Sequence, residues 1–103
     1  MSGDLIALGP GKVDLLESIT RKGSISQAAR EIQLSYRRAW NMVDTMNRCF
    51  KEPLVTSVTG GKGGGGAELT ATGKKVIRTY RKMEKKADTT IQTEWESLQK
   101  HLR

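Results

Sequence analysis

The spacing of hydrophobic residues near the start of the chain predicts a helix. Between residues 12 and 22, Val13, Leu16 and Ile19 recur every three positions, and mostly polar or charged side chains lie between them. This is the spacing of one face of an amphipathic helix. Gly23 follows the basic end of the segment, as is typical of a helix C-terminus. We therefore expect the first helix to span residues 12–22.

A second, shorter helix is expected directly afterwards. Ser24 or Ser26 offers a side-chain oxygen that can cap its first turn. Ala28, Ala29 and Ile32 supply a compact apolar face. The segment has room for only about two helical turns.

A third helix is predicted from Ser35, again a capping residue, to about Lys51, where Pro53 follows. Two helices separated by a three- or four-residue break, the first short and rich in alanine, form the helix-turn-helix arrangement. The small alanines allow the two helices to cross closely. Ordinary helical hairpins share part of this pattern.

The third helix divides into two faces at about 100° per residue. Its apolar face consists of Ala39, Met42, Val43, Met46 and Phe50, with Tyr36 and Trp40 at the margin, and its polar face consists of Arg37, Arg38, Asn41, Asp44, Thr45 and Arg48.

This division suits a helix that reads DNA, because one face packs on a core and the other carries hydrogen-bonding groups. Arginine pairs with guanine and asparagine with adenine in the major groove. A polar face that is merely solvated is the alternative. We expect Arg37, Arg38 and Asn41 to contact base edges, and Ser35, Tyr36, Thr45 and Arg48 to contact the DNA backbone or groove walls.

Two segments with alternating, β-branched or apolar residues follow. Residues 54–59, LVTSVT, predict one strand, and residues 67–70, AELT, can return antiparallel to it. A hairpin after a helix-turn-helix is the winged form of that motif. A further short strand is predicted over Asp4–Leu8, because this apolar run ends at Gly9-Pro10.

The turn of the hairpin contains six glycines and Lys62 within residues 60–66. A Walker phosphate-binding loop requires Ser or Thr after the lysine, and Gly63 follows Lys62 here. A linker would join two independent folds, yet neither flank has the usual size of a domain. We interpret the run as the tip of the wing, where glycine lets the backbone approach DNA closely. Lys62 is then a further expected contact to the DNA.

Thr70 is expected to cap a further helix, and the chain is expected to be helical from there almost to its end. One apolar stripe runs along the segment, too long for so small a domain to cover. Such a stripe commonly pairs with its own copy in a two-fold dimer. We expect residues 1–69 to form the DNA-binding domain and residues 70–103 a dimerisation helix, with Val76, Ile77, Tyr80, Met83, Ala87, Ile91, Trp95, Leu98 and Leu102 in the interface.

The charge distribution supports a directed surface for a polyanion. Residues 35–86 carry a net charge of +8, whereas residues 1–34 are neutral and residues 87–103 carry −1. A charge that serves solubility alone is the alternative. The long helix also has a basic face, which can either contact phosphates or simply be solvated. This face consists of Lys74, Lys75, Arg78, Arg81, Lys82, Lys85 and Lys86.

Other function classes find little support. Cys49 is the single cysteine and His101 the single histidine, so neither a disulfide framework nor a metal cluster is expected. We interpret the acidic pairs Asp14 with Glu17 and Glu94 with Glu96 as solvated helix residues rather than catalytic carboxylates. No segment resembles a signal peptide or a membrane span, so we expect a cytoplasmic protein that is not an enzyme and needs no cofactor.

Three stretches together resemble a known family. GSISQAAREIQLSYRRAW, PLVTSVTGGKGGGGAELTATG and the helix after them are similar to the DNA-binding half of ModE-type molybdate-responsive transcription regulators. That half in turn resembles the winged helix-turn-helix of LysR-type regulators. The resemblance implies a mainly α-helical fold with a small β-hairpin. It also implies a dimer on a near-palindromic operator, with residues 35–51 in the major groove.

The resemblance places the expected function in molybdenum transport or molybdenum-enzyme genes. The resemblance implies C-terminal molybdate-binding domains in full-length family members; we expect these domains to be missing here, and no cluster of residues argues for a molybdate site. We therefore expect a dimeric, sequence-specific regulator that consists of the DNA-binding domain only. Two alternatives are a module that forms mixed dimers with a full-length regulator and a sequence-neutral, nucleoid-type DNA binder.

Overall fold

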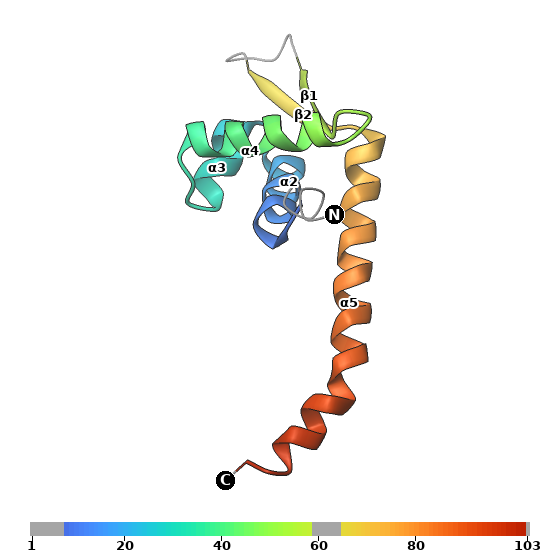
Figure 1. The fold of residues 1–103 in the computed structure, drawn as a ribbon. Helices are drawn as coiled ribbons and strands as arrows, with labels where there is room; N and C mark the ends of the chain where they lie inside the picture. The colour runs from blue at the N-terminus through green and yellow to red at the C-terminus, as the bar shows by residue number, and fades with distance from the viewer. Residues whose placement is uncertain (1–7, 59–64, 103) are drawn as a thin grey trace.

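The computed structural model describes residues 8–58 and 65–102. Three helices, α2 (Pro10–Lys22), α3 (Ile25–Glu31) and α4 (Tyr36–Cys49), form a small body. Strands β1 (Val55–Val58) and β2 (Gly66–Leu69) form an antiparallel hairpin at one end of this body. Helix α5 (Ala71–Gln99) begins beside the hairpin and leaves the body as a long arm (Figure 1). The fold is the expected one: mainly α-helical, with one small hairpin.

Side-chain caps begin three of the helices where the sequence predicted them. The Ser24 hydroxyl accepts a hydrogen bond from the Gln27 amide at 3.1 Å, so Ser24 rather than Ser26 is the cap of α3. Ser35 caps α4 and Thr70 caps α5 in the same way, at 3.1 Å and 2.9 Å. Gly23 ends α2 with a left-handed backbone, φ 78°. Each of the three side-chain caps, Ser24, Ser35 and Thr70, accepts a hydrogen bond from an amide that the helix itself leaves without a partner.

The predicted boundaries differ from the observed ones by a few residues at most. Helix α2 starts at Pro10, two residues before the prediction, because proline suits the first turn of a helix. Helix α4 ends at Cys49 rather than near Lys51, since Phe50 already has an extended backbone. Of the strand predicted over Asp4–Leu8, only Leu8 lies within the described residues, and Leu8 belongs to no strand.

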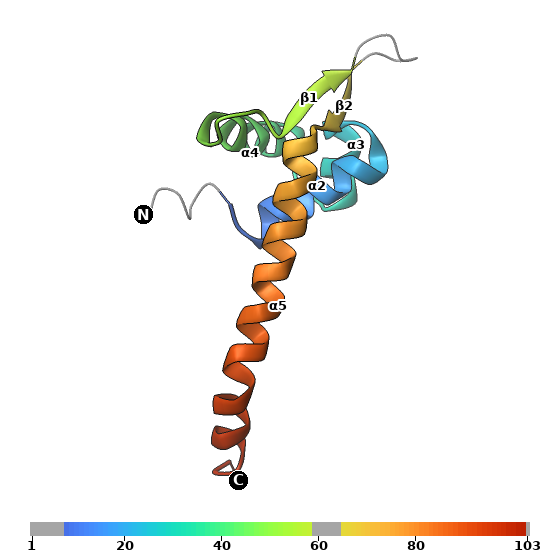
Figure 2. The same ribbon diagram turned by 90° about the vertical axis from the view of Figure 1, so that its right-hand side faces the viewer.

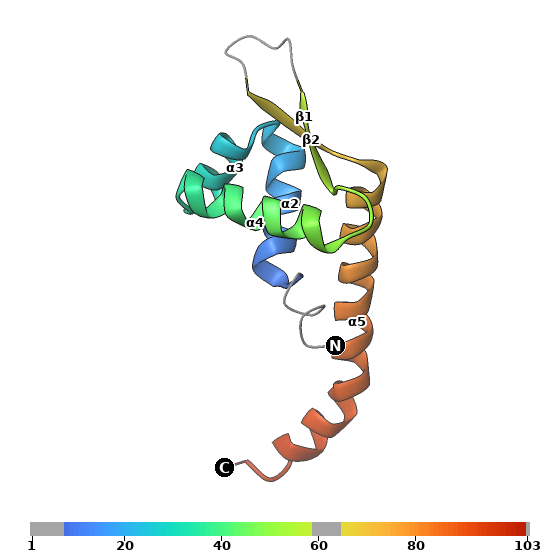
Figure 3. The ribbon, with the colours of Figure 1, turned by 45° about the horizontal axis from the view of Figure 1, so that its top comes forward.

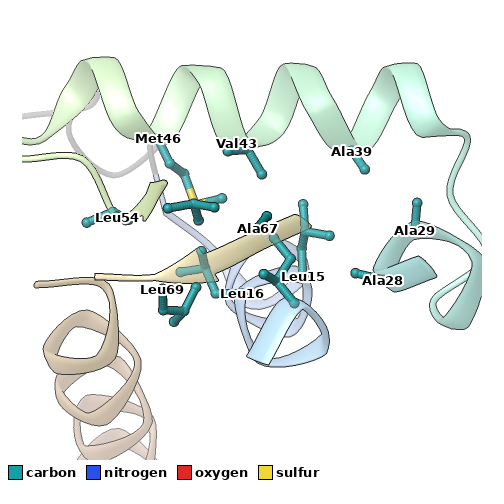
Figure 4. Packing of buried hydrophobic residues seen from close by; sticks show 12 residues of the cluster. Leu15, Leu16, Ala28, Ala29, Ala39, Val43, Met46, Leu54, Ala67 and Leu69 are labelled. Carbon is teal, nitrogen blue, oxygen red and sulfur yellow. The ribbon is translucent and has the colours of Figure 1, made fainter. Parts of the chain in front are cut away.

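The core lies where α2, α3, α4 and the hairpin meet (Figure 4). Burial of each large aliphatic side chain contributes about 1.5–3 kcal/mol relative to exposure. Ala28 and Ala29 of α3 and Ala39 of α4 lie in this core where the two helices approach each other (Figure 4). The buried residues of this core are Leu15, Leu16, Ile19, Ala28, Ala29, Ala39, Val43, Met46, Leu54, Val55, Ala67 and Leu69.

The start of α5 is attached closely to the segment before β1. The Thr70 amide donates to the Leu54 carbonyl at 2.9 Å, and the Thr70 hydroxyl donates to the Pro53 carbonyl at 2.8 Å. One turn later, a Cβ atom added to Gly73 would lie 2.3 Å from the Leu54 carbonyl oxygen. No residue larger than glycine fits at this position without a shift of the backbone, so Gly73 allows α5 to start against the body.

Candidate nucleic-acid interface

Helix α4 presents the polar face that the sequence predicted. Its buried side consists of Ala39, Val43 and Met46, which lie in the core, while Met42 and Phe50 are partly buried against it. Figure 3 shows α4 crossing in front of α2 with the hairpin above it, so the opposite side of α4 faces away from the body. The residues predicted to contact DNA on α4 or at its cap are all exposed: Ser35, Tyr36, Arg37, Arg38, Asn41, Thr45 and Arg48.

One groove gathers most of these side chains. Ser35, Arg37, Arg38, Asn41 and Thr45 line it. Met42 from α4 and Lys12 from α2 complete its walls. The structure therefore brings the three predicted base-contacting residues to one place, on the first half of α4.

A second, larger groove separates α4 from the hairpin. Tyr36 and Trp40 line its α4 side, and Thr56 and Ser57 lie on its β1 side. Tyr36 is 56 % exposed and Trp40 is 46 % exposed, which is unusual for aromatic side chains of this size. The sequence placed both residues only at the margin of the apolar face. The structure shows them as part of the surface between α4 and the wing.

The position of the wing relative to α4 depends on Asn47, which the sequence analysis did not single out. Its Oδ1 accepts hydrogen bonds from the amides of Leu54 and Val55 at 2.8 Å and 3.2 Å. Its Nδ2 donates to the Val55 carbonyl at 3.0 Å. Asn47 thus ties the last turn of α4 to the first residues of β1. The sequence signal that could have indicated this role is the position of Asn47 beside the apolar face of a helix and shortly before a strand.

A hydrogen-bonded cluster joins α2 to α3. The Arg21 guanidinium contacts the Glu31 carboxylate at 2.8 Å, and the Ser18 hydroxyl also donates to that carboxylate. These two hydrogen bonds lower the pKa of Glu31 to about 2. Glu31 in turn raises the pKa of Arg21. Because α3 precedes α4 by only a short turn, this cluster also helps to hold α4 in place.

The interpretation of Asp14 and Glu17 as merely solvated residues is wrong. Both carboxylates bind the Arg81 guanidinium of α5, at 2.7 Å and 2.6 Å respectively, and Arg81 also contacts Glu84 at 2.9 Å. Arg81 accordingly belongs neither to a solvated face nor to a phosphate-binding one. The two acidic residues lie three positions apart, on the face of α2 that meets α5, and three nearby carboxylates neutralise the cation.

Arg48 also has an acidic neighbour. Its guanidinium lies 3.0 Å from the Asp44 carboxylate, one turn earlier on α4. The Arg48 side chain is 78 % exposed, and exposed pairs of this kind contribute little to stability. Arg48 is therefore oriented along the helix surface while it remains accessible.

The apolar stripe of α5 has two parts. Val76 and Ile77 are partly buried against the core of the same chain, and Tyr80 is half-buried. Beyond them, the stripe is exposed to solvent, and Ala87 lies within this part. Its large members are Met83, Ile91, Trp95, Leu98 and, just past the helix, Leu102, with exposed fractions between 48 % and 64 %.

The described part of the chain has neither a candidate metal-binding cluster nor a helix that could span a membrane. Residues 8–58 and 65–102 contain no group of three or more histidine, cysteine, aspartate or glutamate side chains that could hold a metal ion. Among these residues there is also no helix that is both long and apolar enough to cross a membrane. Lys62, predicted at the wing tip, lies outside the described residues.

Helices α3 and α4, the hairpin and the exposed face of α4 define a winged helix-turn-helix domain, the fold of many DNA-binding regulators. The model of the bacterial regulatory helix-turn-helix proteins of the lysR family matches residues 11–74, more than half of the chain. The chain belongs to this family, which is one of DNA-binding transcription regulators rather than an enzyme class.

Several characterised proteins are similar to the chain. It is 47 % identical over 78 residues to the molybdenum transport protein ModE of Azotobacter vinelandii, covering 76 % of this chain and 29 % of that protein. It is 51 % identical over 77 residues to the molybdenum-pterin-binding protein MopB of Rhodobacter capsulatus, covering 75 % and 28 %. The DNA-binding transcriptional dual regulator ModE of Escherichia coli is 45 % identical over 71 residues, covering 69 % and 27 %. The chain thus spans less than a third of the length of these relatives.

Solved structures agree on the fold. Full-length LysG from Corynebacterium glutamicum superimposes with a TM-score of 0.61 at 24 % identity, covering 85 % of this chain and 29 % of that one. Another LysR family transcriptional regulator has the same TM-score at 15 % identity, covering 84 % and 28 %. At these identities the likeness concerns the fold alone.

Proposed function

We propose that the chain binds a specific double-stranded DNA operator as a homodimer and regulates transcription of genes for molybdenum transport or molybdenum enzymes. The observation that carries this proposal is the exposed polar face of α4, which lies beside a wing and is anchored to the body on its other side. A helix held in this way can enter the major groove while the wing lies against the neighbouring part of the duplex.

Base recognition is assigned to the first half of α4. Arg37 and Arg38 carry the planar donor pairs that suit guanine, and Asn41 carries the donor–acceptor pair that suits adenine. The three side chains line one groove, which supports a shared role. Ser35 and Thr45 line the same groove, and Arg48 lies about one turn further along α4. All three are assigned to phosphates and sugars, which position the helix without reading sequence.

The groove between α4 and the hairpin is assigned to one sugar-phosphate strand. A wing in the minor groove and a helix in the adjacent major groove necessarily have a DNA strand between them. Tyr36 and Trp40 can donate from their hydroxyl and indole N–H groups to phosphate oxygens, and their rings can cover deoxyribose. Lys62 is assigned to the same role at the wing tip by its sequence position.

Dimerisation is assigned to the exposed stripe of α5. Five large hydrophobic side chains from Met83 to Leu102 lie in solvent, and a continuous apolar surface of this kind usually meets a partner. A second copy of α5 is the simplest partner, because a two-fold axis pairs the stripe with itself. Val76 and Ile77 contact their own core, so the interface is centred further along α5, on Ile91 and Trp95.

The dimer can be tested separately from DNA binding. Ile91→Lys introduces a charge in the middle of the stripe, and Thr93→Lys introduces the same charge elsewhere on the exposed helix. Analytical ultracentrifugation should give a dimer for the wild type and for Thr93→Lys, and a monomer for Ile91→Lys. A monomeric wild type would contradict the assignment. Native mass spectrometry after mixing with a longer ModE-type regulator would distinguish self-pairing from mixed dimers.

The link to molybdenum is supported by the relatives. The three relatives compared above, two named ModE and one named MopB, are 45–51 % identical to this chain over 71–78 residues. Whether molybdate affects the domain is part of the test. Selection of binding sites from a randomised duplex library, followed by sequencing, should yield a two-fold-symmetric site with half-sites about one helical turn apart. Repeating the selection with molybdate should give the same site, and no enriched sequence would indicate a neutral binder.

A further inference from the structure

Polar and close backbone contacts attach helix α5 to the body at two points along its axis, and Val76 and Ile77 pack against the core between them. The first is its N-terminus, where Thr70 and Gly73 lie against Leu54. The second is Arg81, which binds carboxylates of α2. Gly73 and Arg81 are eight residues apart, which corresponds to about 12 Å of helix. Two attachments separated in this way fix the direction of a rod, whereas one attachment leaves a pivot.

The second attachment is a fork of charged hydrogen bonds. The Nη2 atom of Arg81 donates to Asp14 at 2.7 Å and to Glu17 at 2.6 Å, and Nε donates to the other oxygen of Glu17 at 3.3 Å. Nη1 donates to Glu84 at 2.9 Å, within α5 itself. The planar guanidinium has its donors in a rigid fork, so it fixes direction in a way that a lysine ammonium does not.

Among residues 8–58 and 65–102, no comparable contact follows further along the arm. Every residue of α5 from Lys85 to Gln99 is exposed to solvent. Figure 2 shows this part of α5 continuing well beyond the end of α2. A small rotation at the attachment therefore becomes a large displacement at the far end, where Ile91 and Trp95 lie.

We infer that Arg81 is a positioning residue that sets the distance between the two α4 helices of the dimer, and with it the spacing of DNA half-sites that the protein accepts. This inference rests on the proposed dimer. If the two arms pair through their exposed stripes, the angle between each arm and its body determines where each α4 lies. Loss of the Asp14–Arg81–Glu17 bridge leaves only the contacts of the cap and the first two turns of α5, at Thr70, Gly73, Val76 and Ile77, as a short joint, and the α4 helices then sample a range of separations.

The chain contains a natural probe for this distance. Cys49 is the last residue of α4, it is exposed, and it is the only cysteine in the sequence. A nitroxide spin label on Cys49 of each protomer reports the separation of the two α4 helices by pulsed electron paramagnetic resonance. The variant Arg81→Met removes the charged fork and retains a long apolar side chain. The matched control is Arg78→Met, because Arg78 is exposed on α5 and forms no ion pair with any described residue.

The wild type and Arg78→Met should give one narrow distance distribution. Arg81→Met should give a distribution roughly twice as wide or wider, as expected of a released hinge. Arg81→Lys, which retains the charge without the fork, should fall between them and is the variant to examine if Arg81→Met does not fold. A distribution as narrow as the wild type in a folded Arg81 variant would overturn the inference, as would a broad distribution in the wild type.

Operators with altered spacing supply a second readout. Insertion of two base pairs between the half-sites should weaken wild-type binding by about tenfold or more, and binding of Arg81→Met by less than about threefold. Equal losses in both proteins would overturn the inference while leaving the proposed function intact. No dipolar signal from the labelled wild type would instead remove the dimer on which both proposals depend.

Discussion

Asn47 on α4 and Val55 on β1 exchange hydrogen bonds in both directions: the Val55 amide donates to Oδ1 at 3.2 Å, and Nδ2 donates to the Val55 carbonyl at 3.0 Å. The Asn47 side chain thus pairs with the backbone of Val55 as a neighbouring β-strand would. The wing and the candidate recognition helix are consequently held as one unit.

The first prediction concerns this exchange. Asn47→Ala removes the partners of the Leu54 and Val55 backbone groups, which lie in a partly buried environment. The free energy of unfolding should fall by about 1–3 kcal/mol. Asn41→Ala is the same substitution on the exposed face of α4 and should change it by less than about 0.5 kcal/mol. Urea unfolding measures both, and equal effects would show that Asn47 has no special structural role.

The second prediction concerns Gly73 and Gly11. Alanine normally stabilises a helix relative to glycine by about 1 kcal/mol. At Gly73 the added Cβ would lie 2.3 Å from the Leu54 carbonyl oxygen, so Gly73→Ala should be destabilising despite its helix propensity. At Gly11, in α2, nothing lies within 4 Å of the added atom, so Gly11→Ala should be neutral or stabilising. Thermal unfolding gives the two signs, and a stabilised Gly73→Ala would contradict the close contact.

The third prediction concerns acid stability. Glu31 has a pKa of about 2 in the folded protein and about 4.5 as its usual value. Because the folded pKa is the lower one, the stabilisation is fully present above pH 4.5 and is lost as the pH falls from 4.5 toward 2. Glu31→Gln should flatten the decline in unfolding free energy across this interval. Urea midpoints between pH 2 and 6 provide the measurement, and parallel curves for the two proteins would refute the role of Glu31.

The fourth prediction separates base contacts from backbone contacts. Arg37→Ala and Arg38→Ala should each cost about 1–3 kcal/mol of binding and relax preference at one base position. Lys62→Ala should weaken binding to all duplexes alike and lower the slope of log affinity against log salt by about one. Titrations with a selected operator and its single-base variants distinguish the two patterns. If both arginine variants bind the operator like the wild type, the assignment of α4 as the recognition helix is wrong.

Local signals were sufficient to predict most of the fold. Caps at Ser35 and Thr70, the stop at Gly23 and the three-residue spacing in α2 are properties of neighbouring residues, so the helices could be located to within a few positions. The polar face of α4 followed from helix geometry alone, and the structure exposes all of its members except Asp44, which is partly buried.

Contacts between distant segments could not be predicted in this way. Arg81 meets Asp14 and Glu17 across more than sixty residues of sequence. Seen in the sequence alone, each of these charged residues looks like an ordinary solvated residue on a helix surface. The same holds for the contact of Gly73 with Leu54, which depends on where the hairpin directs the chain. The exposure of Trp40 could not be predicted either, because its position on the helix wheel lies between the two faces.

Sequence-selective binding by the exposed face of α4 is tested most directly by the ratio of two DNA-binding affinities. The affinity of the wild-type chain for its selected duplex is compared with its affinity for a scrambled duplex of the same length and composition at physiological salt. Recognition through α4 predicts a ratio of about 10³ or more, and a marked decrease of that ratio in the Arg37→Ala variant. A ratio near one would contradict the account, because charge alone would then be responsible for binding.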